Sequence, residues 1–117
     1  MTGENLAALL EMLRAPGSAE IMTEEILAAL LEMLRVDLGI STTAYDSRLS
    51  QYLQMAAGQI KVEGATLDYE SLSDRQLIVM YAAWMWRRRD SGEGMPRMLR
   101  YLLNNRVFSE KAAVTDG

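Results

Sequence analysis

The chain has 117 residues, half of them apolar and 24% charged, with a formal net charge of −4 and neither cysteine nor histidine. This length suits a single domain, and the composition is too apolar for a disordered chain. The missing residue types exclude disulfides, thiolate chemistry and the usual proton shuttle. The longest apolar run, residues 77–86, is too short to span a bilayer as a helix, so we expect no membrane contact.

The first 35 residues contain an internal repeat. Residues 1–14 recur as residues 22–35 with twelve of fourteen positions identical. Each copy spaces its leucines as one face of an amphipathic helix, and Thr2 and Thr23 are suitable N-caps. In the second copy this apolar face consists of Leu27, Leu30, Leu31 and Leu34.

The two copies compete for any groove that fits one of them. Asn5 of the first copy is replaced by Ile26 in the second, which extends the apolar face, and Gly3 is replaced by Glu24, a better helix former. We therefore predict that the second copy holds the native site. Residues 1–21 are then a duplicated extension, displaced or disordered, and both a true duplication and an added segment stay open as its origin.

The second predicted helix follows a glycine stop and a hydroxyl cluster. Gly39 ends the repeat helix, and Thr43 to Asp46 has the spacing of a variant capping box. The apolar stripe that follows ends near Gly64. Its predicted core residues are Leu49, Leu53 and Ile60.

The third predicted helix, residues 74–89, is apolar on every side. Ser73 and Gln76 have capping-box spacing, and the helix closes on three arginines, which suit a helix C-terminus. A helix of this kind is either central to the core or half covered by a partner. Leu77 and Tyr81 are its predicted core residues.

The fourth predicted helix starts at Pro96, which fits the first helical position. Met98, Leu99, Leu102 and Leu103 form its predicted apolar face, of which Leu99 and Leu102 are core candidates. Residues 109–117 have no periodicity and are expected to be a flexible tail.

The elements together predict an all-α fold. We expect a small bundle of about four helices, with an extra duplicated N-terminal helix and flexible termini. Its parts are the extension 1–21, a helical domain 22–108 and the tail 109–117.

Charge is unevenly distributed along the chain. Residues 1–74 carry twelve acidic and four basic side chains, whereas residues 75–106 carry seven arginines and two acidic side chains. Such halves can attract each other within one chain or between copies. The alternative is a pair of solvated helix faces.

No catalytic constellation is visible in the sequence. Two carboxylate pairs, Asp68 with Glu70 and Asp90 with Glu93, lie in polar loops without a histidine partner or apolar surroundings that would shift a pKa. We therefore expect no enzymatic activity, no catalytic residue, no metal site and no cofactor.

The segment 84–106 combines arginines with aromatic and methionine side chains. Arginines neutralise phosphates and aromatic rings stack on bases, which would suit nucleic acid. The same residue types are enriched at protein interfaces, and the acidic net charge argues against a dedicated nucleic-acid binder. We therefore favour an oligomer or partner interface, with the candidate residues Trp84, Trp86, Arg87, Arg88, Arg89, Met95, Arg97 and Arg100.

The order of several short segments resembles the phage head–tail connector family, the small helical head-completion adaptors. The resemblance covers residues 24–106 and depends on order and spacing more than on any single motif. The matching segments are LRVDL at 34–38, YDSRL at 45–49, AAGQI at 56–60, DRQLI at 74–78, YAAWMWRRR at 81–89, MP at 95–96 and LRYLLN at 99–104.

The resemblance implies a non-enzymatic virion protein of the head–tail junction, made in the cytoplasm of a bacterial host. Such adaptors form a ring beneath the portal, with its twelvefold symmetry, and extend the DNA channel without binding DNA specifically. Their expected partners are copies of the same chain, the portal protein, and a tail or stopper protein. The duplicated N-terminus departs from the family pattern. The alternative is a small helical DNA-binding regulator that uses the arginine-rich segment 87–106.

Overall fold

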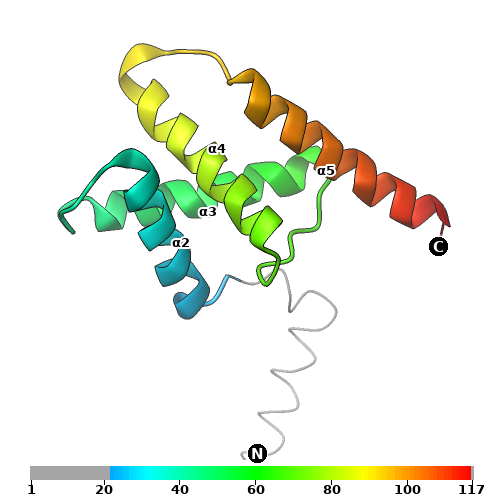
Figure 1. The fold of residues 1–117 in the computed structure, drawn as a ribbon, viewed down its shortest axis with the longest axis horizontal. Helices are drawn as coiled ribbons and strands as arrows, with labels where there is room; N and C mark the ends of the chain where they lie inside the picture. Colours follow the sequence, from blue (N-terminus) through cyan, green and yellow to red (C-terminus); the bar gives the residue numbers. More distant parts are fainter. Residues whose placement is uncertain (1–21, 117) are drawn as a thin grey trace, which may run out of the picture.

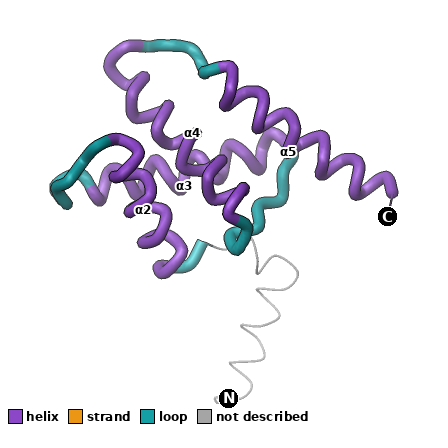
Figure 2. The backbone as a smooth tube through the Cα atoms, viewed as in Figure 1, coloured by secondary structure: helices purple, strands orange, loops and turns teal. Residues whose placement is uncertain are grey.

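The structure is a computed structural model that describes residues 22–116. Within these residues the chain forms four α-helices joined by loops, and no strand (Figure 2). The predicted all-α bundle is therefore confirmed. The helices are α2 (Glu24–Leu38), α3 (Asp46–Glu63), α4 (Leu72–Ser91) and α5 (Arg97–Asp116). The first copy of the repeat lies outside the described residues.

Helix α4 is the centre of the bundle. It contacts α3, α2 and α5, and α3 crosses behind it while α2 and α5 flank it (Figure 1). This arrangement explains why residues 77–86 are apolar on every side, because three helices cover them. The C-terminal end of α5 projects beyond the other helices (Figure 1).

Both ends of α2 follow local sequence signals. The Thr23 side chain accepts a hydrogen bond from the backbone N–H of Ile26 at 3.2 Å, as an N-cap does. Gly39 adopts a left-handed conformation with φ of 71°, and its N–H donates to the last carbonyls of the helix. The predicted ends of this helix, the N-cap Thr23 and the stop at Gly39, are therefore confirmed.

The predicted cap of α3 at Thr43 is wrong. The helix begins at Asp46, and its N-cap residue, Tyr45, makes no side-chain cap. Thr43 contributes only its backbone carbonyl, which accepts from the N–H of Asp46 at 3.1 Å. The carboxylate of Asp46 instead receives Nη1 of Arg35 at 3.2 Å, so a contact between α2 and α3 takes the place of a capping box.

The N-cap of α4 lies two residues earlier than the predicted cap at Ser73. Ser71 is the N-cap, and its Oγ accepts from the N–H of Asp74 at 3.3 Å. Asp74 is thus the third residue of the helix, and its carboxylate accepts from the N–H of Asp68 at 2.8 Å. The cap is therefore local, because Ser71 and Asp74 have capping-box spacing, and the Asp74 carboxylate also holds the connection to α3.

The expected flexible tail begins inside a helix. Helix α5 continues past residue 108 to Asp116, so the expected tail 109–117 is helical as far as residue 116. An ion pair between Nη1 of Arg106 and Oε2 of Glu110, 2.8 Å long, spans that boundary with the favourable i, i+4 spacing. This pair stabilises the helix across the start of residues 109–116, whose sequence shows no helical periodicity.

The core is one continuous apolar cluster. Of the eleven predicted core residues, Leu27, Leu31 and Leu102 are partly buried and pack against it. The sequence reading missed Ala65, Leu67 and Tyr69 in the connection between α3 and α4, although their alternation is typical of an extended buried segment. The other eight predicted residues are buried: Leu30, Leu34, Leu49, Leu53, Ile60, Leu77, Tyr81 and Leu99.

Gly64 brings α5 close to the end of α3. Its φ is 120°, and a Cβ atom added there would lie 3.2 Å from Cγ1 of Val107 on α5. A side chain at this position would be strained and would also press on α5.

Truncating Leu53, a fully buried residue of α3, should leave a cavity in the core. We expect Leu53→Ala to lower the free energy of unfolding by about 2–5 kcal/mol, measured by urea denaturation. Met55→Ala on the same helix is the matched control, because Met55 is exposed, and should stay within about 0.5 kcal/mol. Equal losses for the two variants would contradict this core.

Candidate protein interface

The arginines at the end of α4 have partners within the chain. Arg87 donates from Nη2 to the backbone carbonyl of Asp37 at 3.2 Å, and lies 3.6 Å from its carboxylate. Asp37 belongs to the last turn of α2. The acidic and basic parts of the sequence thus meet at this point within one chain.

The next two arginines cover tryptophan rings. The guanidinium carbon of Arg88 lies 4.7 Å from the Trp84 ring centroid, and that of Arg89 lies 3.6 Å from the Trp86 centroid. Both distances are within the range of cation–π attraction. Consecutive helix positions point about 100° apart, which agrees with three different partners for three arginines.

The tryptophans themselves join an aromatic cluster on the domain. Trp86 makes edge-to-face contacts with Tyr45 and Tyr52, at centroid separations of 5.6 and 5.8 Å, so it links α4 to α3. Trp84 packs edge-to-face on Tyr81, and its Nε1 donates to the carbonyl of Gly94 at 3.1 Å. Burial raises the pKa of the Tyr81 hydroxyl.

The three remaining candidate interface residues are Met95, Arg97 and Arg100, which lie beside this cluster or on α5. Met95 is partly buried and packs against the core. Arg100 pairs with Glu63, its Nη1 2.8 Å from Oε1, and so joins α5 to α3. Arg97 is exposed at the first position of α5. Seven of the eight candidate interface residues therefore make contacts inside the domain, and Trp84, Trp86 and Met95 are partly buried there.

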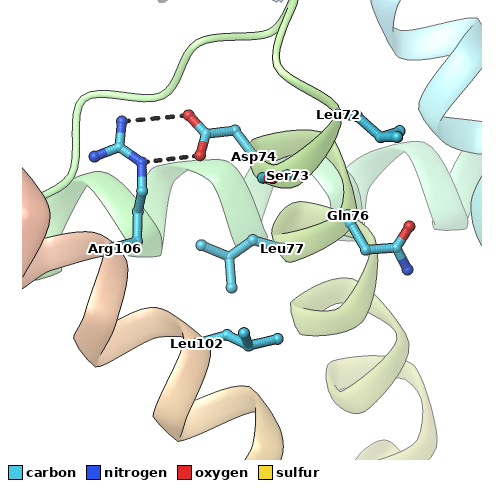
Figure 3. Close-up of a pocket in the computed structure, with 7 residues that line it drawn as sticks. All are labelled: Leu72, Ser73, Asp74, Gln76, Leu77, Leu102 and Arg106. Carbon is cyan, nitrogen blue, oxygen red and sulfur yellow. Dashed lines mark hydrogen bonds and ion pairs between the residues drawn. The ribbon is translucent and has the colours of Figure 1, made fainter.

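An ion pair that the sequence reading missed joins α4 to α5. Asp74 is buried, and the Arg106 guanidinium meets it with two donors, Nε to Oδ1 at 2.8 Å and Nη2 to Oδ2 at 3.3 Å (Figure 3). Arg106 also donates to the Thr66 carbonyl at 2.5 Å. The hydrogen bond to Asp74, with a further one to Glu110, raises the pKa of Arg106 despite its burial. Asp74 and Arg106 are 32 positions apart, and no local sequence pattern connects residues at that separation. The pair therefore could not be predicted from the sequence.

A cavity of about 360 Å³ lies below this ion pair, between α4 and α5. Leucine side chains form its walls, with Leu77 and Leu102 on facing helices and Leu72 at its edge (Figure 3). Asp74 and Arg106 form its polar end (Figure 3). Both charged groups are already paired with each other, so the cavity offers an apolar surface more than a polar site.

Helix α5 has a second apolar face that points away from the domain. Met98, Tyr101 and Phe108 are 61%, 62% and 73% exposed, and the helical repeat places them within about 80° of one another. Met98 was expected on the inner face beside Leu99, but Leu99 is buried and Met98 is not. The spacing 98, 101, 108 is itself a helical face and could have indicated this surface. We call these three residues the outer face of α5.

The part of the chain that the structure describes contains no group of three or more metal-ligating side chains. None of its helices is long and apolar enough to cross a membrane. The loop carboxylate of Asp68 accepts from the N–H of Glu70 at 3.0 Å, and Asp90 lies 3.9 Å from Arg89, so both have local partners.

Comparisons with known proteins give no relative. No family model matches the chain, and no curated protein and no solved structure matches it. The surfaces described above are therefore interpreted from their own geometry and chemistry.

Removing the charge of Asp74 should leave the Arg106 guanidinium without its main partner. We expect Asp74→Asn to lower the free energy of unfolding by about 1–3 kcal/mol in chemical denaturation. Asp90→Asn is the control, because the Asp90 side chain is 84% exposed and its ion pair is long. It should change stability by less than about 0.5 kcal/mol. If Asp74→Asn left the free energy of unfolding unchanged, the Asp74–Arg106 ion pair would not be what holds α5 against α4.

Glu110 should make the stability of the domain depend on pH. Its hydrogen bond with Arg106 holds the pKa of Glu110 below the ordinary value, so the folded state favours the carboxylate more than the unfolded state does. This stabilisation is complete above the ordinary glutamate pKa of about 4.3 and is lost as the pH falls through the lower folded value.

The test compares the unaltered chain with Glu110→Gln. The difference between their unfolding free energies should be constant near neutral pH and shrink below about pH 4. A difference that grows on acidification would show that the sign of this shift is wrong.

Proposed function

We propose that the chain is a structural virion protein, a head–tail connector subunit that assembles into a ring beneath the portal. The outer face of α5 carries this proposal. Methionine and aromatic residues are enriched at protein interfaces, and burying each of these side chains would contribute about 1.5–3 kcal/mol. The order of segments along residues 34–104, which resembles the connector family, supports the same function.

A ring requires two different surfaces on each subunit, because its contacts are head-to-tail. The second surface in this proposal is a groove of about 520 Å³ on the α2 side of α4. It is lined by Met33 and Val36 of α2 and by Val79 of α4, and Val36 is 78% exposed. Helices α2 and α5 flank α4 (Figure 1), so the outer face of one subunit can meet the groove of the next.

Charge supports the same pairing of surfaces. Glu32 lies at the groove, whereas Arg97 is exposed next to Met98 at the start of α5. The other charged groups of the groove, Asp37 and Arg75, already have partners within the chain, Arg87 and the Tyr69 carbonyl. Opposite charges at the edge of an apolar contact steer association and fix its register. In the assembled virion this ring would surround the DNA channel and present a docking surface to the tail or stopper protein, with DNA passing through unbound.

The DNA-binding regulator is the weaker candidate. A base can stack only on an uncovered ring face, and Arg88 and Arg89 each cover one face of the neighbouring tryptophan. Arg87 and Arg100 are paired with carboxylates of the same chain. These arginines and aromatic rings therefore contribute to the domain itself, and few of them remain for a phosphate backbone.

Placing charge on the outer face of α5 should prevent assembly without unfolding the subunit. We expect Tyr101→Glu/Phe108→Glu to keep the helical circular dichroism of the unaltered chain. It should lose rings, and binding to the cognate portal protein, in electron microscopy of the mixture. Val62→Glu is the control, because Val62 is 79% exposed on α3 and lies outside both proposed surfaces.

Normal rings from the double variant would contradict the proposed contact. A gel shift with duplex DNA separates the two candidate functions. The connector predicts weak binding that the double variant leaves unchanged, whereas tight binding with a steep salt dependence would favour the regulator. Charge reversal at residues 87–89 is a poor test of assembly, because it would also break contacts inside the domain.

A further inference from the structure

The repeat and the structure together define a binding seat for one amphipathic helix. Helix α2 packs on α3 and α4, and at its centre Leu30 and Leu34 are 0% exposed. Leu27, Leu31 and Met33 are partly buried against the same core. We call the surface of α3 and α4 that receives these side chains the α2 seat.

The first copy of the repeat has the same residue types as α2 at most of the positions that contact the α2 seat. At the two fully buried positions it also has leucine, Leu9 and Leu13. Arg35, which pairs with Asp46, corresponds to Arg14. Thr2, Leu6, Leu10 and Met12 match the N-cap and three further α2 contacts, whereas Gly17 stands at the position of Leu38.

The two differences between the copies fall at tolerant positions. Glu24 is exposed, so the glycine at position 3 would lose helix propensity but no packing. Ile26 is only partly buried, so the asparagine at position 5 would lose part of one apolar contact. Neither difference blocks the leucines from the core.

We propose that residues 1–14 are a second occupant of the α2 seat, and that the two copies exchange there within one chain. The segment between Arg14 and Asp46 contains the whole second copy and is long enough to loop out when the first copy is seated. A tethered helix has a high effective concentration at the seat, which favours the same chain over a neighbour. The exchange releases residues 22–35, with their leucine stripe, for another apolar surface.

The structure also explains why the second copy is the one in the seat. After Arg35 the helix continues to Leu38 and is closed by Gly39, and Asp37 meets Arg87. After Arg14 the sequence is Ala-Pro-Gly, and proline disfavours a helical residue before it. The first copy therefore lacks the last helical turn and its contact with α4.

Disabling one copy at a time in the full chain tests this exchange. Leu30→Asp/Leu34→Asp places charge at the buried positions of the second copy. We expect this variant to unfold cooperatively with native helical circular dichroism, at a lower melting temperature, because the first copy takes the seat. Adding Leu9→Asp/Leu13→Asp should abolish the cooperative transition. Leu9→Asp/Leu13→Asp alone is the matched control and should melt as the unaltered chain does.

Two results would overturn the proposal. One is loss of cooperative unfolding in Leu30→Asp/Leu34→Asp alone, as complete as in the fourfold variant. The other is a rescue that depends on concentration, with a larger mass than the unaltered chain in analytical ultracentrifugation, which would mean that a neighbouring copy fills the seat. A monomer-like mass and a melting temperature independent of concentration support exchange within the chain.

Discussion

The burial of α4 is the constraint on which the rest of the structure depends. A helix with a ten-residue apolar run must be covered on most of its surface, and no single neighbour can do so. Helix α3 crosses it, α2 and α5 flank it, and each of the three supplies leucines to one cluster. The outer face of α5 and the groove beside α2 are what this arrangement leaves uncovered.

Local signals in the sequence were sufficient to predict where the helices lie. They were not sufficient to predict which residues pair between helices. Thr23 and Gly39 act within one turn, so their roles in bounding α2 can be read from neighbouring residues. The pairing of Asp74 with Arg106 depends on how two helices approach each other, and nothing near either residue encodes it. Met98 shows the same limit, because the orientation of α5 decides which side of an apolar helix faces the core.

The uneven charge along the sequence places oppositely charged side chains on neighbouring helices of the fold, which the composition alone does not indicate. Exposed ion pairs contribute little stability, but several of those in the described residues join different helices and so favour one arrangement of the bundle. With many charges engaged inside the subunit, the proposed assembly depends on apolar contacts more than on attraction between oppositely charged halves. The pairs that join helices are Arg35–Asp46, Arg87–Asp37, Arg100–Glu63 and Arg106–Asp74.

Arg106 anchors α5 and divides it into two parts, whose backbone hydrogen bonds open at different rates. Before Arg106, Leu99 and Leu103 are buried, so amide hydrogens there exchange with solvent only when the domain opens. Lys111 and Ala112 are exposed, and a helix end of this kind opens locally and more often. A partner that binds near Met98 therefore meets preformed backbone, whereas ordering a frayed residue beyond Glu110 costs about 1–2 kcal/mol. Met98, Tyr101 and Phe108 all precede Glu110, so a partner on the outer face avoids this ordering cost.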